Sequence, residues 1–158
     1  MRLTDVMSEE LVVASLKGTA RDDVLAEVVD CIIAVRPELE RVRTLQVLLE
    51  RERLSSTGVG AGFAIPHGKR PELKSMVVCF ARSTPGVEFG ALDGHRSHLF
   101  LTLLAPEGAA LHLKALARAS RLLKDADFRA RLIAEPDRST LWRLLREKDD
   151  HLAKEDRE

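Results

Sequence analysis

Residues 55–69 read SSTGVGAGFAIPHGK, and this stretch divides the chain into its helical and strand-forming parts. Four glycines and one proline fall within the eleven residues from Gly58 to Gly68. Glycine at this density indicates turns, or a close approach of the backbone to another group. Two helical patterns precede the stretch, and strand patterns follow it.

The two helices expected before the glycine-rich stretch are amphipathic. The first begins after Gly18, with Thr19 as its N-cap, and ends before Pro37. Its apolar residues recur at helical spacing, at Leu25, Val28, Val29, Ile32 and Ile33. The second helix spans about residues 39–53, and one side of it carries Leu39, Val42, Leu45, Leu48 and Leu49.

Buried strands are expected after the glycine-rich stretch. Val77–Ala81 and His98–Leu104 are apolar runs that are rich in β-formers and bounded by turn residues. Val87–Phe89 is expected to form a short additional strand, closed by a turn at residues 92–94.

Helical spacing returns after Glu107. The next helix is expected to turn one face to the core, formed by Leu113, Leu116, Ala117, Ser120 and Leu123. A short helix around Phe128 and a last helix capped by Ser139 follow, and the charged residues 147–158 are expected to fray. Residues 1–146 therefore form one α/β domain, a sandwich with a central mixed β-sheet flanked by helices.

The composition excludes several classes of protein. Of the 158 residues, 45% are hydrophobic and 32% are charged, which describes a globular chain. Lys+Arg and Asp+Glu both number 25, so the net charge is zero and gives no support to a nucleic-acid partner. No apolar run approaches the roughly 20 residues that span a bilayer, and no signal peptide opens the chain, so a cytoplasmic location is expected. Cys31 and Cys79, both in apolar runs, are expected to be buried thiols.

His67 is the first candidate for chemistry. It follows the apolar run Ala64-Ile65-Pro66, where Pro66 stiffens the backbone, and Gly68 is expected to leave room for the imidazole. A histidine titrates near neutrality, so a neutral ring nitrogen is available as a nucleophile. Taken alone, a structural histidine at a strand end is the more common explanation.

His112 and Arg51 are the further candidates. His112 falls in the first turn of the helix after Glu107, near unpaired backbone donors that favour an anion. Arg51 ends the second helix together with Arg53, and the planar fork of a guanidinium matches phosphate oxygens. An exposed first-turn histidine and a solvated helix end are the ordinary alternatives.

A metal site has little support in the sequence. Asp93, His95 and His98 could be imagined as ligands, but the intervening residues indicate an exposed turn. Neither cysteine belongs to a CxxC pair, and the spacings HExxH and HxxEH are absent, so a metal-dependent hydrolase is not favoured. No cofactor and no metal are expected.

The stretch from Glu52 to Gly68 resembles the phosphorylation-site motif of the mannitol/fructose class of enzyme IIA domains of the bacterial phosphotransferase system, including the nitrogen-related regulatory branch. Every constrained position of that motif is filled, by Glu52, Val59, Gly60, Phe63, Ala64, Ile65, Pro66, His67 and Gly68. The resemblance extends over about residues 11–145. One departure is Ala61, where relatives often carry a polar residue such as Asn.

The resemblance implies roles for the candidate residues. His67 would be the phosphorylated histidine, His112 a second active-site histidine that stabilises the phosphoryl group, and Arg51 the arginine that neutralises its charge. Thr57 and Gly68 would contribute to phosphate binding. The donor would be HPr, a small histidine phosphocarrier protein, or its nitrogen-branch counterpart.

Three functions remain open at this stage. The chain is expected to be a regulatory enzyme IIA whose phosphorylation state controls binding to target proteins. Alternatively, it is a relay subunit that passes the phosphate to a sugar-specific IIB domain for fructose- or mannitol-type uptake. A function of another class is a non-catalytic protein-binding module on the same fold, which the intact His67, His112 and Arg51 disfavour. Insertion into a membrane is not expected.

Overall fold

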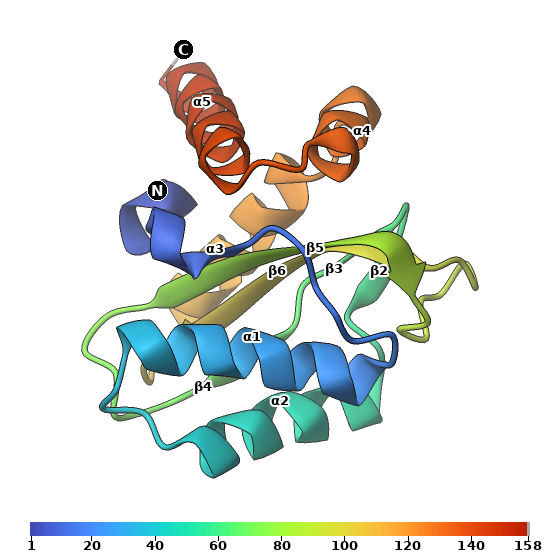
Figure 1. Cartoon of the computed structure of the whole chain (residues 1–158). Helices are drawn as coiled ribbons and strands as arrows, with labels where there is room; N and C mark the ends of the chain where they lie inside the picture. Colours follow the sequence, from blue (N-terminus) through green and yellow to red (C-terminus); the bar gives the residue numbers. More distant parts are fainter. Residues whose placement is uncertain (158) are drawn as a thin grey trace.

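The computed structural model describes residues 1–157, in which helices cover both faces of one sheet (Figure 1). Two short 3₁₀ helices come first, η1 at Leu3–Val6 and η2 at Glu9–Leu11. The α-helices are α1 Arg21–Val35, α2 Arg41–Leu54, α3 Ala109–Leu122, α4 Ala126–Ala134 and α5 Arg138–Asp156. The strands are β1 Val12–Val13, β2 Gly58–Gly60, β3 Phe63–Ala64, β4 His67–Lys69, β5 Val77–Val87 and β6 Ser97–Ala105.

The sheet is mixed, as expected from the sequence. Its strand order is β1-β5-β6-β3-β2. β5 and β6 form an antiparallel pair, while β3 and β4 both run parallel to β6. Phe63 lies opposite Leu99 and His67 lies opposite Leu103, so β3 and β4 follow one another along the same edge of β6. His67, which follows the glycine-rich segment, therefore lies beside the C-terminal part of β6.

Strand alternation separates two cores. Leu99, Leu101 and Leu103 of β6 face the layer formed by α3, α4 and α5, whereas Phe100 and Leu104 face α1 and α2. β5 alternates in the same way, and nearly all of its residues are buried. Figure 1 shows α1 and α2 on one side of the sheet and the three C-terminal helices on the other.

The two N-terminal helices form where their spacing predicts, with two differences. The N-cap of α1 is Ala20 rather than Thr19, and it makes no side-chain capping bond. Val42 was expected on the apolar face of α2 but is 56% exposed, because α2 buries only the side that carries Leu48. Pro37 follows the C-cap Arg36, as expected.

The expected third strand is not a separate element. Val87 is the last residue of β5, and beyond it only Glu88 makes an isolated bridge, to Ala20. The register between β5 and β6 shifts between Arg82 and Val87, and this irregularity lets β5 run on past the predicted end at Ala81. The turn at residues 92–94 is present, closed by a hydrogen bond from Gly94 N–H to the Ala91 carbonyl.

Helix α3 is rotated relative to the sequence-based prediction. Leu113 was expected in the core but is 64% exposed, and Ala117 and Ser120 are also exposed. The buried face instead carries small residues and leucine at Ala115, Ala119 and Leu122. Small side chains allow the helix to approach the sheet closely. Of the predicted stripe, Leu123 is buried and Leu116 is half-buried, while Leu113, Ala117 and Ser120 lie at the surface.

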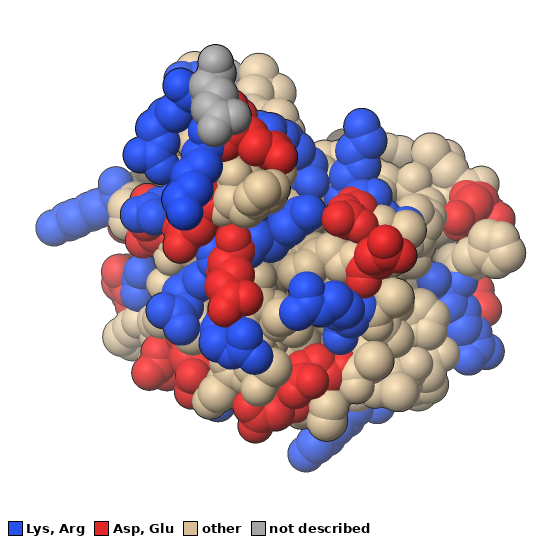
Figure 2. Space-filling view, turned by 90° about the horizontal axis from the view of Figure 1, so that it is seen from above, with Lys and Arg blue, Asp and Glu red and all other residues tan. Residues whose placement is uncertain are grey.

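Charged side chains of both signs are mixed on the face of the molecule seen from above (Figure 2). Figure 2 views the molecule from above, and on this face Lys and Arg alternate with Asp and Glu instead of gathering by sign. Within residues 1–157, none of the helices combines the length and the apolar character that crossing a membrane requires. Both cysteines are free thiols, and Cys79 is buried while Cys31 is half-buried.

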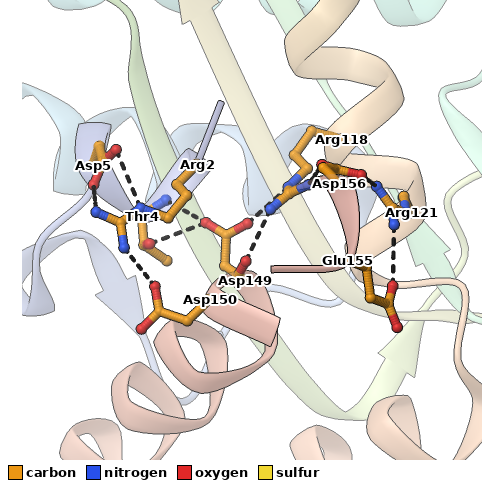
Figure 3. Close-up of polar contacts among 9 residues, drawn as sticks. All are labelled: Arg2, Thr4, Asp5, Arg118, Arg121, Asp149, Asp150, Glu155 and Asp156. Atoms are coloured by element: carbon orange, nitrogen blue, oxygen red, sulfur yellow. Dashed lines mark hydrogen bonds and ion pairs between the residues drawn. The ribbon is translucent and has the colours of Figure 1, made fainter. Parts of the chain in front are cut away.

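The C-terminal segment, expected to fray from residue 147, continues α5 to Asp156 instead. The reason is a polar cluster between η1, α3 and α5 (Figure 3). Asp149 is fully buried and accepts hydrogen bonds from Arg118 Nε at 2.9 Å and from the backbone N–H of Thr4 at 2.9 Å.

The start of α5 is capped by Asp137 and not by Ser139 as predicted, since the Asp137 side chain accepts a hydrogen bond from Thr140 N–H.

Candidate functional site

His67 opens β4, and the backbone on both sides of it is fixed. The carbonyl of Pro66 accepts a hydrogen bond from Leu103 N–H at 2.9 Å, which ties the residue before His67 to β6. The half-buried ring places Nδ1 2.8 Å from the carbonyl oxygen of Ile65. Since a carbonyl only accepts, Nδ1 carries the proton and Nε2 keeps its lone pair.

Arg51 contacts the other ring nitrogen. It lies in the last turn of α2, and its Nε–H donates to His67 Nε2 over 3.3 Å. This contact requires the same tautomer as the Ile65 contact, because Nε2 must be the acceptor. Nη1 of Arg51 also donates to the carbonyl of Ser55 at 2.8 Å, which secures the guanidinium at the helix end.

His112 comes to the site from the opposite layer. It lies in the first turn of α3, and its ring centroid is 5.2 Å from that of His67, with the two planes inclined at 55°. The buried Nδ1 of His112 finds no hydrogen-bond partner among the described residues. The structure thus brings together the three residues that the sequence indicated, from α2, β4 and α3.

Both imidazoles favour the neutral form. Burial lowers the pKa of His67, the nearby Arg51 charge lowers it further, and the hydrogen bond to the Ile65 carbonyl opposes the change. Burial also lowers the pKa of His112, helped by His67 and by the charge of Lys69. At neutral pH the site therefore presents uncharged rings beside a permanent guanidinium cation.

A pocket of about 370 Å³ opens beside His67. Its walls come from α2, the glycine-rich stretch and α3, and are formed by Arg51, Ser56, Thr57, Val59, Ile65, His67, Leu116, Ala117 and Ser120. Leu116, Ala117 and Ser120 belong to the α3 stripe that was expected in the core. Their helical spacing was visible in the sequence, but an apolar stripe that lines a site has the same spacing as one that packs in a core.

Thr57 and Gly68 lie at the site, but the structure gives them other contacts. The Thr57 hydroxyl donates to the carboxylate of Glu52, and Thr57 is only 5% exposed. A Cβ on Gly68 would overlap Cγ1 of Val47 in α2. Glycine at this position is therefore needed for the packing of β4 on α2.

The remaining candidates do not join the site. Arg53 is exposed at the end of α2. Nδ1 of His98 lies 3.1 Å from the carbonyl oxygen of Ser83, between the two long strands. In the part of the chain that the structure describes, no three His, Cys, Asp or Glu side chains are grouped so that they could hold a metal ion.

Sequence reasoning assigned no role in the site to Glu52 or to the carbonyl of Ile65. Glu52 was noted only as a position of the motif, and it is buried against Thr57. A signal was present in the sequence, because an acidic residue in the last turn of a helix opposes the helix dipole and calls for a local explanation.

The chain matches a known protein family over most of its length. The family described as "Phosphoenolpyruvate-dependent sugar phosphotransferase system, EIIA 2" matches residues 5–148. A protein of Bradyrhizobium diazoefficiens named "Nitrogen regulatory protein" is 40% identical over 146 residues, which cover 92% of this chain and 95% of the relative.

Two further relatives are similar over most of this chain. The "PTS system fructose-specific EIIABC component" of Bacillus subtilis is 30% identical over 94% of this chain, which spans only 24% of that relative. The crystal structure of "Nitrogen Regulatory Protein IIA-Ntr" from Neisseria meningitidis superposes with a TM-score of 0.83 and 26% identity, covering 90% of this chain and 98% of the other.

Proposed function

This chain belongs to the EIIA 2 family of the phosphoenolpyruvate-dependent sugar phosphotransferase system, and from that premise we propose that Nε2 of His67 accepts the phosphoryl group. The chain is a phosphoryl-transfer component of that system and a homologue of nitrogen regulatory proteins. The resemblance inferred from residues 52–68 is confirmed.

The observation that carries the proposal is the single tautomer of His67. Nδ1–H donates to the Ile65 carbonyl at 2.8 Å, so the lone pair of the ring is on Nε2, next to Arg51 and within the pocket. The lowered pKa of His67 keeps this nitrogen unprotonated at neutral pH. A nucleophile of this kind needs no separate base, because it has no proton to lose at the attacking atom.

The transfer step balances without a metal or any other reactant. The Nε2 lone pair of His67 forms a bond to phosphorus, and the bond from phosphorus to the carrier's histidine nitrogen breaks. The electron pair of that bond stays on the carrier's imidazole, whose other ring nitrogen carries a proton, so that the carrier leaves as a neutral ring and the positive charge passes to His67. As positive charge develops on the His67 ring, the Nδ1–H bond to the Ile65 carbonyl stabilises it, since hydrogen bonds from charged donors are stronger.

Arg51 and His112 would bind the equatorial oxygens. The Arg51 guanidinium moves from the Nε2 lone pair to the incoming phosphoryl oxygens, for which its planar fork is suited. His112 stays neutral, and a neutral imidazole keeps one N–H that can donate to a phosphoryl oxygen. Positioning and charge neutralisation of this kind account for most of the catalysis in phosphoryl transfer.

A regulatory role is favoured over a relay role. The Bradyrhizobium and Neisseria proteins named nitrogen regulatory protein match this chain over nearly their whole length. The Bacillus relative, whose name joins A, B and C components, supports the relay alternative over a quarter of its length. We therefore place the chain downstream of an HPr-like phosphocarrier, with target proteins that respond to its phosphorylation state.

A reconstituted phosphotransfer assay tests this function. Phosphoenolpyruvate, enzyme I, HPr and the protein are combined, and we expect an acid-labile, base-stable label that is absent in His67→Ala. His112→Ala should fold and accept phosphate slowly. A label that persists in folded His67→Ala contradicts the assignment. Loss of the label on addition of a IIB domain and sugar would favour the relay role over the regulatory one.

A further inference from the structure

Glu52 has a buried carboxylate in the last turn of α2, directly after Arg51. Its exposed fraction is 3%. A negative charge at a helix C-terminus opposes the helix dipole, and burial of a carboxylate is unfavourable unless its oxygens are hydrogen-bonded. For the stability of the helix alone, an apolar or basic residue would serve better, so the position calls for another explanation.

Among the described residues, both hydrogen bonds of the Glu52 carboxylate come from Thr57. The backbone N–H of Thr57 donates to Oε2 at 2.9 Å, and the Thr57 hydroxyl donates to Oε1. Burial raises the pKa of Glu52, while these hydrogen bonds and the Arg51 charge oppose the rise. Thr57 is itself buried, so if the carboxylate is removed its backbone N–H and its hydroxyl cannot form hydrogen bonds to water instead.

A series of hydrogen bonds leads from Thr57 to the nucleophile. The Thr57 carbonyl accepts from Ile65 N–H at 3.2 Å. The Ile65 carbonyl in turn accepts from Nδ1 of His67 at 2.8 Å, and this is the contact that fixes the tautomer. The position of the Ile65 peptide therefore depends on Thr57, and the position of Thr57 depends on Glu52.

A second hydrogen bond joins the end of α2 to the segment that contains Thr57. Arg51 donates to the Ser55 carbonyl at 2.8 Å, two residues before the one that Glu52 binds. Arg51 and Glu52 thus hold opposite polar groups of one short segment, a carbonyl and an N–H. The two contacts fasten residues 55–57 to the end of α2.

We propose that Glu52 is a positioning residue for phosphoryl acceptance, which, through Thr57 and Ile65, holds the His67 ring in the tautomer whose lone pair is on Nε2. The inference rests on the proposed role of His67 as the acceptor. Glu52 touches neither the ring nor the pocket, so its effect is on geometry and not on charge transfer.

The test compares Glu52→Ala and Glu52→Gln with Glu50→Gln. Glu50 is exposed on the same helix, and its carboxylate makes a long surface ion pair, with Oε1 3.9 Å from Nη1 of Arg43. The Glu50→Gln variant therefore serves as the matched control. The ¹⁵N resonances of the unphosphorylated His67 ring report the tautomer directly, and a purely structural role would leave them unchanged. We expect well-separated Nδ1 and Nε2 resonances in the wild type and in Glu50→Gln, and resonances that approach one another in Glu52→Ala.

Phosphoryl transfer from the phosphorylated carrier is the second measurement. A misplacement near 1 Å at a reacting group costs roughly 10- to 100-fold in rate, and we expect a loss in that range for Glu52→Ala. Glu52→Gln keeps one carbonyl oxygen for one of the two Thr57 donors, so it should restore part of both the rate and the resonance separation.

Three outcomes test the positioning role of Glu52. A folded Glu52→Ala variant with wild-type ring resonances and wild-type transfer overturns the proposal. If Glu52→Ala fails to fold, Thr57→Val removes only the hydroxyl donor, and unchanged resonances in both Thr57→Val and Glu52→Gln overturn it equally. If the wild type carries no phosphate on His67, the proposed function fails, while the tautomer measurement still judges Glu52.

Discussion

Nε of Arg51 lies 3.3 Å from Nε2 of His67, so the nitrogen proposed to attack phosphorus is covered by a cationic donor before any phosphate arrives. The Ile65 carbonyl holds the opposite nitrogen at 2.8 Å. For transfer to occur, Arg51 must release the lone pair, while the contact to Ile65 can persist. The residue that protects the nucleophile is then the residue that receives the phosphoryl oxygens.

Arg51→Gln tests this double role. Removal of one preorganised donor to a developing charge typically costs about 10²- to 10³-fold in rate, and we expect a loss of that order in single-turnover transfer from the carrier. Arg53→Gln is the control, because Arg53 is exposed at the same helix end. Equal losses in the two variants would mean that overall positive charge, and not the Arg51 contact, governs the reaction.

The pH dependence of transfer should follow the protonation of His67. Burial and the Arg51 charge place the pKa of His67 below the ordinary value near 6.5. As the pH falls through this lowered pKa, Nε2 is protonated and its lone pair is lost, so acceptance declines only in acid. Above it the rate should be flat. Arg51→Gln removes one of the two causes and should raise the pKa, as measured by NMR titration of the ring. A decline that begins above pH 6.5 in the wild type would contradict the assignment.

The site motif was the part of the molecule most open to prediction from sequence. Pro66 restricts the backbone locally and Gly68 frees it, so the pattern around His67 carries information without knowledge of the fold. The long strands β5 and β6 were similarly visible, because burial on both faces requires continuous apolar runs. Their existence was predicted, but their order in the sheet was not, since pairing depends on contacts distant in sequence.

The helices that cover the sheet were harder to orient. Arg118 is buried on α3 because its guanidinium pairs with Asp149, 31 residues further along the chain, and no local pattern contains that information. The same pair explains why a highly charged C-terminal segment is helical and packed. For α3, the exposed stripe and the buried face both had helical spacing, and only the sheet decides between them.

Gly68→Ala should destabilise the fold through contact with α2. The added methyl group would overlap Val47 Cγ1, and overpacking of this kind typically costs about 1–3 kcal/mol of unfolding free energy. Val47→Ala removes the obstructing methyl groups, so the double variant should recover part of the loss in chemical denaturation. If the losses of the two single variants simply add, the overlap is not the cause.

Replacing Ala61 by a residue that tolerates its backbone conformation should stabilise the protein. Its φ of 55° lies in the left-handed region, which costs an L residue other than glycine or asparagine about 1 kcal/mol. Ala61→Gly and Ala61→Asn should therefore raise the melting temperature, and both keep the N–H that donates to Asp93 at 3.0 Å. Ala130→Gly, at an exposed position inside α4, should lower it. A lower melting temperature for both Ala61 variants would contradict this account.

Asp149→Ala should be among the most damaging single changes outside the site. The carboxylate is fully buried and binds Thr4 of η1 and Arg118 of α3, so its removal leaves a buried guanidinium without its main partner (Figure 3). Breaking a buried ion pair in this way costs roughly 3–5 kcal/mol. Asp150→Ala removes a neighbouring carboxylate that pairs with exposed Arg2, and should cost less than about 1 kcal/mol. Urea denaturation distinguishes the two variants. Because α3 also carries His112, Asp149→Ala should slow phosphoryl transfer as well, and equal stabilities of the two variants would show that the cluster does not hold α5 in place.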